Sequence, residues 1–482
     1  MRELTETALN AATRRGVDYA DVRIVERREN VLRVQRRSLK HMEDEETVGY
    51  AVRVLKDGAW GLASDTALEE DRISGAAERA VEVAEASARV PAEQPARMVA
   101  EPAHEESCTA PYDEDPFEVP ASEKADVLLS ACSTMMDVDG IAMAWGRLEF
   151  IRLRRIIANT DGTYLDLTNL FTNPALEATA VTGGDSQNRG YQGGARQAGF
   201  EFVRQIDLPS NAERWAKEAV TKTEADECPE GTMDLVLDPD HLALTMHESV
   251  GHPTESDRVL GWEANMAGRS FVSPSDVGSL KYAADQVTFT ANNRLHGGVG
   301  SWFYDDDGVL MQKFPIIRDG VLQNLSTTRE TAALLGHERS NGCSRASGFS
   351  RFPINRIPNL YMEPGVRTDS DPEDLVADVE RGIYIHGQGS FSIDQMRRNF
   401  QFGGDMFWLI EDGEITKPLK HVTYQARTTD FWKSCDGIAG PAHWKPHGVM
   451  NCGKGEPMQV MFMTHGASHA RFRDIEVGGA SR

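Results

Sequence analysis

The stretch DLVLDPDHLALTMHESVGH, residues 234–252, joins an apolar strand pattern, a turn and a segment with two histidines. The chain changes character just before it, at residue 233. From there on, short apolar runs alternate with glycine and aspartate, which is typical of antiparallel strands joined by tight turns. We therefore predict a β-rich C-terminal domain over residues 230–482, with a few helices, that carries the histidine segment.

The sequence before this domain mixes strand and helix patterns. Residues 20–64 contain alternating apolar positions and a Lys-Asp-Gly turn, which predict strands. Residues 66–88 carry apolar side chains at helical spacing. Six prolines and many acids fall in residues 90–120, which predicts a linker. An N-terminal α/β domain is therefore predicted over residues 1–100.

A second mixed region follows the linker. The run IRLRRIIANTDGTYLDLTN, residues 151–169, predicts a hairpin because two apolar segments flank an Asp-Gly pair. Ser210 and Glu213 have the spacing of a capping box at the start of a helix. We predict a middle α/β region over residues 120–224 that packs with the N-terminal domain, so the overall fold class is α+β or α/β.

The composition excludes several classes of protein. The formal net charge of −24 argues against sequence-independent nucleic-acid binding, which needs a basic surface. No run of 18 apolar residues exists, so no membrane-spanning helix is expected. The first residues carry acids and lack the apolar core of a secretory signal, and the six cysteines are widely spaced. We therefore predict a cytoplasmic protein without a disulfide scaffold.

The two histidines of the opening stretch have an unusual spacing. Zinc peptidases often carry H-E-x-x-H on one helix, but here His247 and Glu248 are followed by His252, one residue late. On a regular α-helix, residues five apart point about 140° away from each other. A π-bulge absorbs one extra residue, or the helix ends near Gly251, and Pro253 biases His252 away from helical dihedrals. We expect His252 at a bulged or terminated turn.

Such a turn provides the parts of a catalytic metal site. Two neutral imidazoles bind zinc, and Glu248 can act as general base toward a water activated by the metal. A third ligand has to come from elsewhere in the chain. Glu255 and Asp257 are candidates to hold a ligand imidazole by its second nitrogen, or are solvated surface acids. Alone, the spacing also fits a structural pair of histidines.

Six further stretches resemble the TldD/PmbA family of metallopeptidases, in the order of that family. The segment VLDPDHLALTMHESVGHPTESDRV, residues 236–259, resembles the family's catalytic segment. The other stretches that carry the resemblance are residues 48–64, 303–336, 359–365, 371–385, 408–420 and 451–479. The H-E-x-x-x-H motif is similar to that of the catalytic TldD-like branch, whereas PmbA-type (TldE) chains lack it and act as partner subunits.

The resemblance implies a zinc metallopeptidase. Mapped onto this chain, it implies that His247, His252 and Cys452, in a Cys-Gly-Lys tripeptide, bind Zn²⁺ and that Glu248 is the base. It also implies α/β domains around a β-rich C-terminal domain, a homodimer or a heterodimer with a PmbA/TldE-like chain, and short, unfolded or modified peptides as substrates. Peptides bound as an added strand would be read by their backbone.

Two stretches depart from the family pattern, namely GQGSFSID at residues 387–394 and the segment after Cys452, CGKGEPMQVMFMTHG. These departures leave the substrate open. Two alternatives to a peptidase therefore remain: an amide hydrolase of a small biosynthetic intermediate, and a non-catalytic partner subunit with a structural zinc. His443 and His447 are candidates for substrate contact, while His465 and His469 are expected not to bind the metal.

Overall fold

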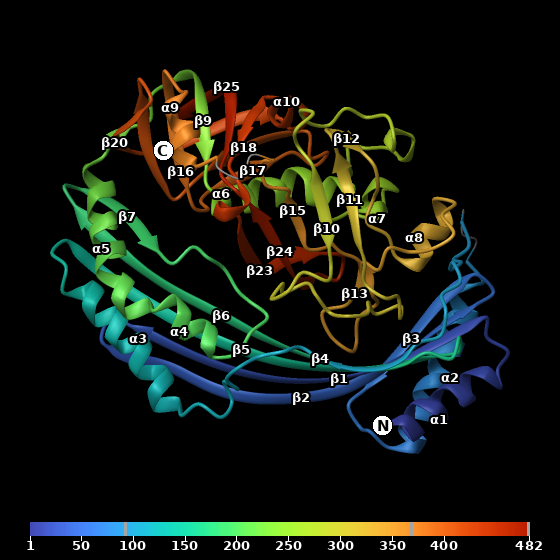
Figure 1. Cartoon of the computed structure of the whole chain (residues 1–482). Coiled ribbons are helices and arrows are strands. Elements are labelled where there is room, and N and C mark those ends of the chain that lie inside the picture. The colour runs from blue at the N-terminus through green and yellow to red at the C-terminus, as the bar shows by residue number, and fades with distance from the viewer. Residues whose placement is uncertain (91–93, 367–369, 480–482) are drawn as a thin grey trace.

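A computed structural model describes residues 1–90, 94–366 and 370–479 and shows two parts that face each other. Long strands from the first half of the chain form a curved sheet, and the C-terminal domain lies on the concave side of that sheet (Figure 1). The expected fold class is confirmed, because α/β structure at the N-terminus precedes a β-rich C-terminal domain.

The curved sheet has seven strands in the order β3-β2-β1-β5-β6-β4, with β7 paired to β6. Side chains alternate between its faces, so Val22 and Ile24 pack against helices while Val25 contacts the C-terminal domain. The hairpin predicted around residues 151–169 is present, with strands longer than predicted. The strands are β1 Tyr19–Gln35, β2 Ser38–Lys56, β3 Ala59–Asp65, β4 Glu105–Thr109, β5 Ile141–Asn159, β6 Tyr164–Thr182 and β7 Asp185–Gly190.

Five helices cover the face of this sheet that points away from the C-terminal domain. They are α1 Arg2–Thr13, α2 Glu70–Ser87, α3 Ala121–Met136, α4 Glu201–Ile206 and α5 Leu208–Glu224. The predicted capping box is wrong: the N-cap of α5 is Asp207, whose side chain accepts a hydrogen bond from the Ser210 backbone N–H. The predicted linker also contains a strand, β4, which pairs in parallel with β6.

The C-terminal domain contains a ten-stranded and a six-stranded sheet. Their orders are β17-β18-β21-β25-β9-β16-β19-β20-β8, with β22 on β25, and β12-β11-β10-β15-β24-β23. The largest apolar core includes residues of both sheets and of α6 (Pro239–Met246), among them Leu242 and Met246. This core fixes the helix that leads into the histidine segment.

The remaining elements of the domain are short. Its strands are β8 Asp226–Glu227, β9 Gly231–Leu237, β10 Phe289–Asn292, β11 Lys313–Arg318, β12 Val321–Leu322, β13 Ser344–Arg345, β14 Ile354–Asn355, β15 Leu360–Met362, β16 Arg381–His386, β17 Phe391–Ile393, β18 Asn399–Gly403, β19 Met406–Glu411, β20 Glu414–Lys420, β21 Val422–Arg427, β22 Cys435–Ile438, β23 Lys445–Lys454, β24 Gln459–Ala467 and β25 Ala470–Gly479. Its helices after α6 are α7 Ser256–Val259, α8 Arg329–Leu334, α9 Pro372–Ala377 and α10 Thr428–Lys433.

Buried ion pairs connect the curved sheet to the C-terminal domain. Arg155 on β5 lies 2.8 Å from Asp306, and Arg53 on β2 lies 2.7 Å from Asp307. All four side chains are at most 6% exposed, so each charge depends on its partner for compensation. The pairs hold the loop of residues 305–307 against the sheet.

All six cysteines are free thiols, in agreement with the prediction that the fold has no disulfide scaffold. Within the described ranges, the helices are too short or too polar to cross a membrane.

Acid should destabilise the start of α6, where His241 is fully buried. Its ring nitrogens bond the Gly387 carbonyl and the Tyr424 hydroxyl, and burial lowers the pKa of the imidazole to about 4. The unfolded chain, with a histidine pKa of about 6.5, binds this proton first, so the free energy of unfolding should fall as the pH drops from about 6.5 to about 4. Urea unfolding across this range measures the slope, and a His241→Gln variant with the same slope would contradict this assignment.

Candidate metal centre

The helix α6 continues directly into a π-helical turn, His247–Gly251, and then a 3₁₀ turn, His252–Thr254. Of the two predicted alternatives, a π-bulge or a helix that ends near Gly251, the structure has the π-bulge. The wide turn brings the rings of His247 and His252 to 4.8 Å between centroids despite their five-residue spacing. Gly251 fits because a Cβ there would meet the Ile357 side chain at 3.0 Å. The extra residue is thus accommodated without separating the two imidazoles.

A second histidine fixes the orientation of His247. The Nδ1 atom of His247 lies 2.7 Å from Nε2 of His465 on β24, and Nδ1 of His465 lies 3.1 Å from the Leu360 carbonyl oxygen. A carbonyl only accepts, so His465 donates to Leu360 and accepts the proton of His247. Burial lowers the pKa of both histidines, which favours their neutral forms. Nε2 of His247 is left free to bind a metal.

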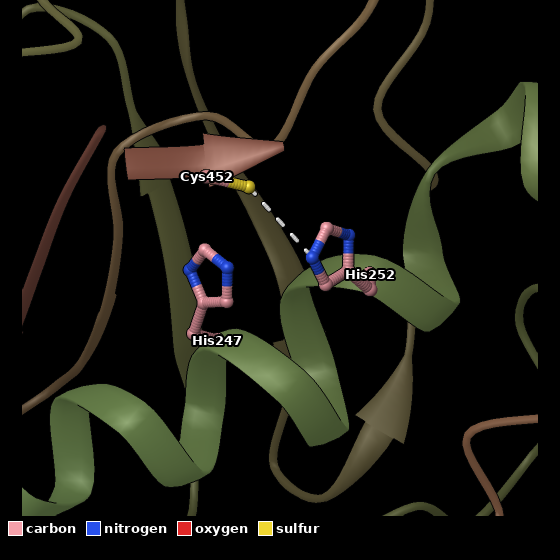
Figure 2. A group of neighbouring side chains, drawn as sticks. All are labelled: His247, His252 and Cys452. Carbon is pink, nitrogen blue, oxygen red and sulfur yellow. Dashed lines mark hydrogen bonds between the residues drawn. The ribbon is translucent and has the colours of Figure 1, made fainter. Parts of the chain in front are cut away.

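His252 is held by a carboxylate. Its Nδ1 lies 2.8 Å from Oε2 of Glu255, and its Nε2 lies 3.8 Å from Sγ of Cys452 (Figure 2). Glu255 is fully buried, but Lys454, 3.0 Å away, and His252 hold the pKa of that carboxyl well below its usual range. Glu255 therefore accepts the Nδ1 proton and leaves Nε2 facing the thiol.

Cys452 comes from β23 and, among the described residues, is the cysteine that clusters with these histidines. Nη2 of Arg356 lies 3.1 Å from its Sγ. Burial raises the pKa of the Cys452 thiol, yet Arg356 and His252 outweigh burial and bring that pKa below its ordinary value. The thiolate, which is the form that binds metals, is therefore favoured.

The three residues fit a zinc ion. Their donor atoms all lie within 4.8 Å of one another. Ligands at 2.0–2.3 Å from one tetrahedral ion are separated by about 3.5 Å, which is close to the distance between His252 and Cys452. Two neutral imidazoles and one thiolate are donors that zinc prefers. A four-coordinate zinc ion held by these three donors would have one further position for water or substrate.

The three donors line a cavity of about 460 Å³ together with Glu248. Arg397, from the turn between β17 and β18, donates a hydrogen bond to Glu248 inside it. The other lining residues are Leu244, Gln388, Gly389, Phe391, Val449, Asn451 and Gly453. Gln388, Gly389 and Phe391 belong to the stretch 387–394, and Gly453 follows Cys452, so both departures from the family pattern reach the wall of this cavity.

Other residues proposed from the sequence lie elsewhere. Asp257 does not contact a ligand imidazole; it pairs with Lys454 at 2.7 Å because that buried ammonium bridges it to Glu255. His443 bonds Asp371, and His447 bonds Asp240 and Gln388; neither lines the cavity. His469, expected not to bind the metal, bonds Tyr384.

Four residues near the site had no signal in the sequence: Arg356, Arg397, Lys454 and, as a partner of His247, His465. His465 is 218 positions from His247, and the packing of α6 against β24 brings the two residues together. Lys454 belongs to the Cys-Gly-Lys tripeptide, for which the resemblance implies a role of Cys452 alone. A strand alternation over residues 459–467 would have placed His465 and Met463 on one face.

Removing the support of His247 should weaken zinc binding. His465→Phe keeps a ring but loses both hydrogen bonds, so the zinc affinity should fall about 10- to 100-fold. His465→Gln can still donate to Leu360 and accept from His247, and should lose less. Competition with a chromophoric chelator measures both affinities. Equal losses in the two variants would show that packing, and not the hydrogen bonds, matters at this position.

Known proteins match along the chain. The family models of the PmbA/TldA metallopeptidase domain 1, central domain and C-terminal domain match residues 20–84, 114–226 and 230–479. A metalloprotease of Methanothermobacter thermautotrophicus is 27% identical over 471 residues, 96% of each chain. A zinc metalloprotease TldD homolog of Saccharolobus solfataricus is 26% identical over 261 residues, 52% of each chain.

Solved structures share the fold. TldE from Thermococcus kodakarensis superposes with a TM-score of 0.74 at 18% identity, covering 98% of this chain and 99% of that one. A crystal structure from Thermotoga maritima gives a TM-score of 0.77 at 18% identity, covering 99% and 100%. Because the C-terminal model alone spans more than half of the sequence and the other two precede it in order, this chain belongs to the PmbA/TldD family of metallopeptidases.

Proposed function

We propose that this chain is a zinc-dependent peptidase for short, unfolded or modified peptides. His247, His252 and Cys452 would hold the zinc, and Glu248 would be the general base. One observation carries the proposal: three zinc-type donors and a glutamate line the same cavity. When bound, zinc would supply Lewis acidity toward the scissile carbonyl and lower the pKa of a coordinated water.

The chain's own residues would do the rest of the work. Glu248 would take the proton of the attacking water on its carboxylate and pass it to the leaving amine. His465 and Glu255 keep the ligand nitrogens of His247 and His252 unprotonated by accepting the opposite ring protons. Leu244, Phe391 and Val449 add apolar surface to the wall of the cavity.

A catalytic role fits the donor set better than a structural one. A structural zinc site fills its four positions with protein ligands and needs no base. Here three donors and an adjacent glutamate are present among the residues described. An amide hydrolase of a small biosynthetic intermediate would use the same groups, and the departures at the cavity wall favour a test of that substrate class.

Zinc content and cleavage of a peptide library, measured on one purified sample, test the proposal. One zinc per chain together with cleavage supports it. Zinc with turnover of a small amide but without peptide cleavage would favour the amide hydrolase. If cleavage appears only after a TldE-like chain is added, the active form is a heterodimer; cleavage by the chain alone, eluting as a dimer, points to a homodimer. Zinc-free protein that cleaves peptides at full rate would contradict the proposal.

A further inference from the structure

Arg397 reaches the cavity from the turn between β17 and β18, and some of its hydrogen-bond donors do not bond Glu248. Its Nη1 donates to Oε2 of Glu248, and its side chain is 13% exposed. Its Nε–H is buried without a hydrogen-bond partner. A guanidinium carries five N–H donors, and within the described residues the contact with Glu248 is the one side-chain bond that Arg397 makes. The N–H groups of Nη1 and Nη2 that do not bond Glu248 can donate to a ligand in the cavity that Arg397 lines.

The backbone around Arg397 is fixed in a costly conformation. Arg397 has a φ of 60°, a left-handed value that side chains other than glycine and asparagine seldom adopt. The Asp394 carboxylate bonds the backbone N–H groups of the two residues after Arg397. The Phe271 N–H donates to the Met396 carbonyl, and the Thr428 hydroxyl donates to the Arg397 carbonyl. Such an enforced backbone next to reacting groups is typical of residues placed for function.

Arg397 is the group in the cavity that could bind an anion. Arg397 is the single lysine or arginine among the residues that line the cavity, while the whole chain has a formal net charge of −24. The negative potential of the whole chain therefore repels anionic substrates. The Arg397 guanidinium supplies a positive charge within the cavity. Its planar fork matches a carboxylate through two parallel hydrogen bonds.

We propose that Arg397 is the receptor for a carboxylate of the peptide substrate, located close to the bond that is cleaved. The proposal rests on the peptidase function above. Arg397 bonds the base itself, so a carboxylate held by its other N–H groups would lie close to the bond that is cleaved. It belongs either to the C-terminus or to an acidic side chain beside the cleaved bond.

The C-terminal source makes the enzyme a carboxypeptidase. Water adds across the last peptide bond: its oxygen goes to the carbonyl carbon, the C–N bond breaks, and the amine receives the proton. The products are a shortened peptide with a new carboxylate and a free amino acid. Arg397 would thus both orient the substrate and share its guanidinium between substrate and Glu248.

Three peptides that differ only at the C-terminus separate the two sources. The first ends in Ala with a free carboxylate, and the second is the C-terminal amide of the first. The third is also an amide, with Glu in place of the last Ala. The zinc-loaded parent should cleave the carboxylate-bearing peptide about 10- to 100-fold more efficiently, as kcat/KM, than the Ala amide. Preference for the free acid identifies the C-terminus, and preference for the Glu amide identifies the side chain.

Arg397→Gln should abolish this preference, and Arg398→Gln should keep it. Glutamine also has a Cβ, so the left-handed φ at position 397 costs about the same conformational energy as with arginine, and the turn should be retained. Arg398 is exposed on the same turn and lies over the Phe271 ring, outside the cavity. Three results would overturn the proposal. The parent could cleave the three peptides equally, the preference could survive in Arg397→Gln, or Arg397→Gln could lose cleavage of all three peptides to the same extent.

Binding separates failure of this proposal from failure of the peptidase function. If the zinc-loaded parent cleaves none of the peptides, the peptidase proposal fails, and calorimetric titration with the same three peptides still tests the receptor. Tighter binding of a carboxylate-bearing peptide to the parent than to Arg397→Gln, by about 10- to 100-fold, would uphold the receptor. Equal affinities would overturn it.

Discussion

Glu248→Gln should abolish most peptide cleavage and leave the zinc content unchanged. The glutamine side chain has nearly the same size but cannot take a proton from water, and Glu248 is not among the three clustered donors. General-base catalysis contributes about 10²- to 10⁴-fold, so kcat should fall by at least about 10²-fold. Steady-state cleavage and metal analysis on the same preparation check both halves of this expectation.

The matched control is Glu213→Gln, which makes the same chemical change on the exposed face of α5 in the N-terminal half. It should retain parental kcat and KM. Arg397 would lose a charged partner in Glu248→Gln, so a thermal melt is needed to show that the variant is folded. A folded Glu248→Gln protein that cleaves at the parental rate would rule out Glu248 as the base.

Cys452→Ala should lose zinc and cleavage together. The thiolate is one of three donors, and loss of an outer partner of a ligand already costs about 10- to 100-fold in affinity, so loss of the ligand should cost more than about 100-fold. Arg356 would also lose its contact with Sγ, although its hydrogen bonds to the carbonyls of Cys452 and Gln459 are unaffected. Chelator competition followed by metal analysis measures the loss.

Cys435→Ala provides the comparison for this variant. Cys435 is equally buried, but it lies in the largest apolar core, and burial raises the pKa of its thiol to about 12. Its replacement should cost some stability and no zinc. Zinc retained at parental affinity in Cys452→Ala would mean that the third ligand lies elsewhere.

Local patterns predicted much of the fold. The alternation in residues 20–64 and 151–169 corresponds to real strands, because one face of each packs on helices and the other on the C-terminal domain. Strand β4, inside the predicted linker, was missed because its sequence EESCT has no apolar alternation. Its strand conformation depends on pairing with β6. Asp207, not Ser210, is the N-cap of α5 because its side chain accepts a hydrogen bond from the Ser210 N–H.

At the site, helical arithmetic predicted what lies close in sequence. The one-residue insertion required a wide turn, and the π-helix at His247–Gly251 provides it. Glu255, three residues from His252, contacts that histidine as the sequence suggested it could. Arg356, Arg397 and His465 lie 96, 149 and 218 positions from their respective partners Cys452, Glu248 and His247. No local pattern encodes such contacts, because distant strands and turns make them.

The separation of the donors along the chain also sets when the centre can form during synthesis. Cys452 lies 200 positions after His252, the residue that it contacts. A ribosome that adds about 5–20 residues per second completes the π-helical turn roughly 10–40 s before it adds the cysteine. During that interval the nascent chain has two imidazoles and a glutamate but no thiolate. The proposed zinc centre would therefore be complete only after β23 has been added and has folded.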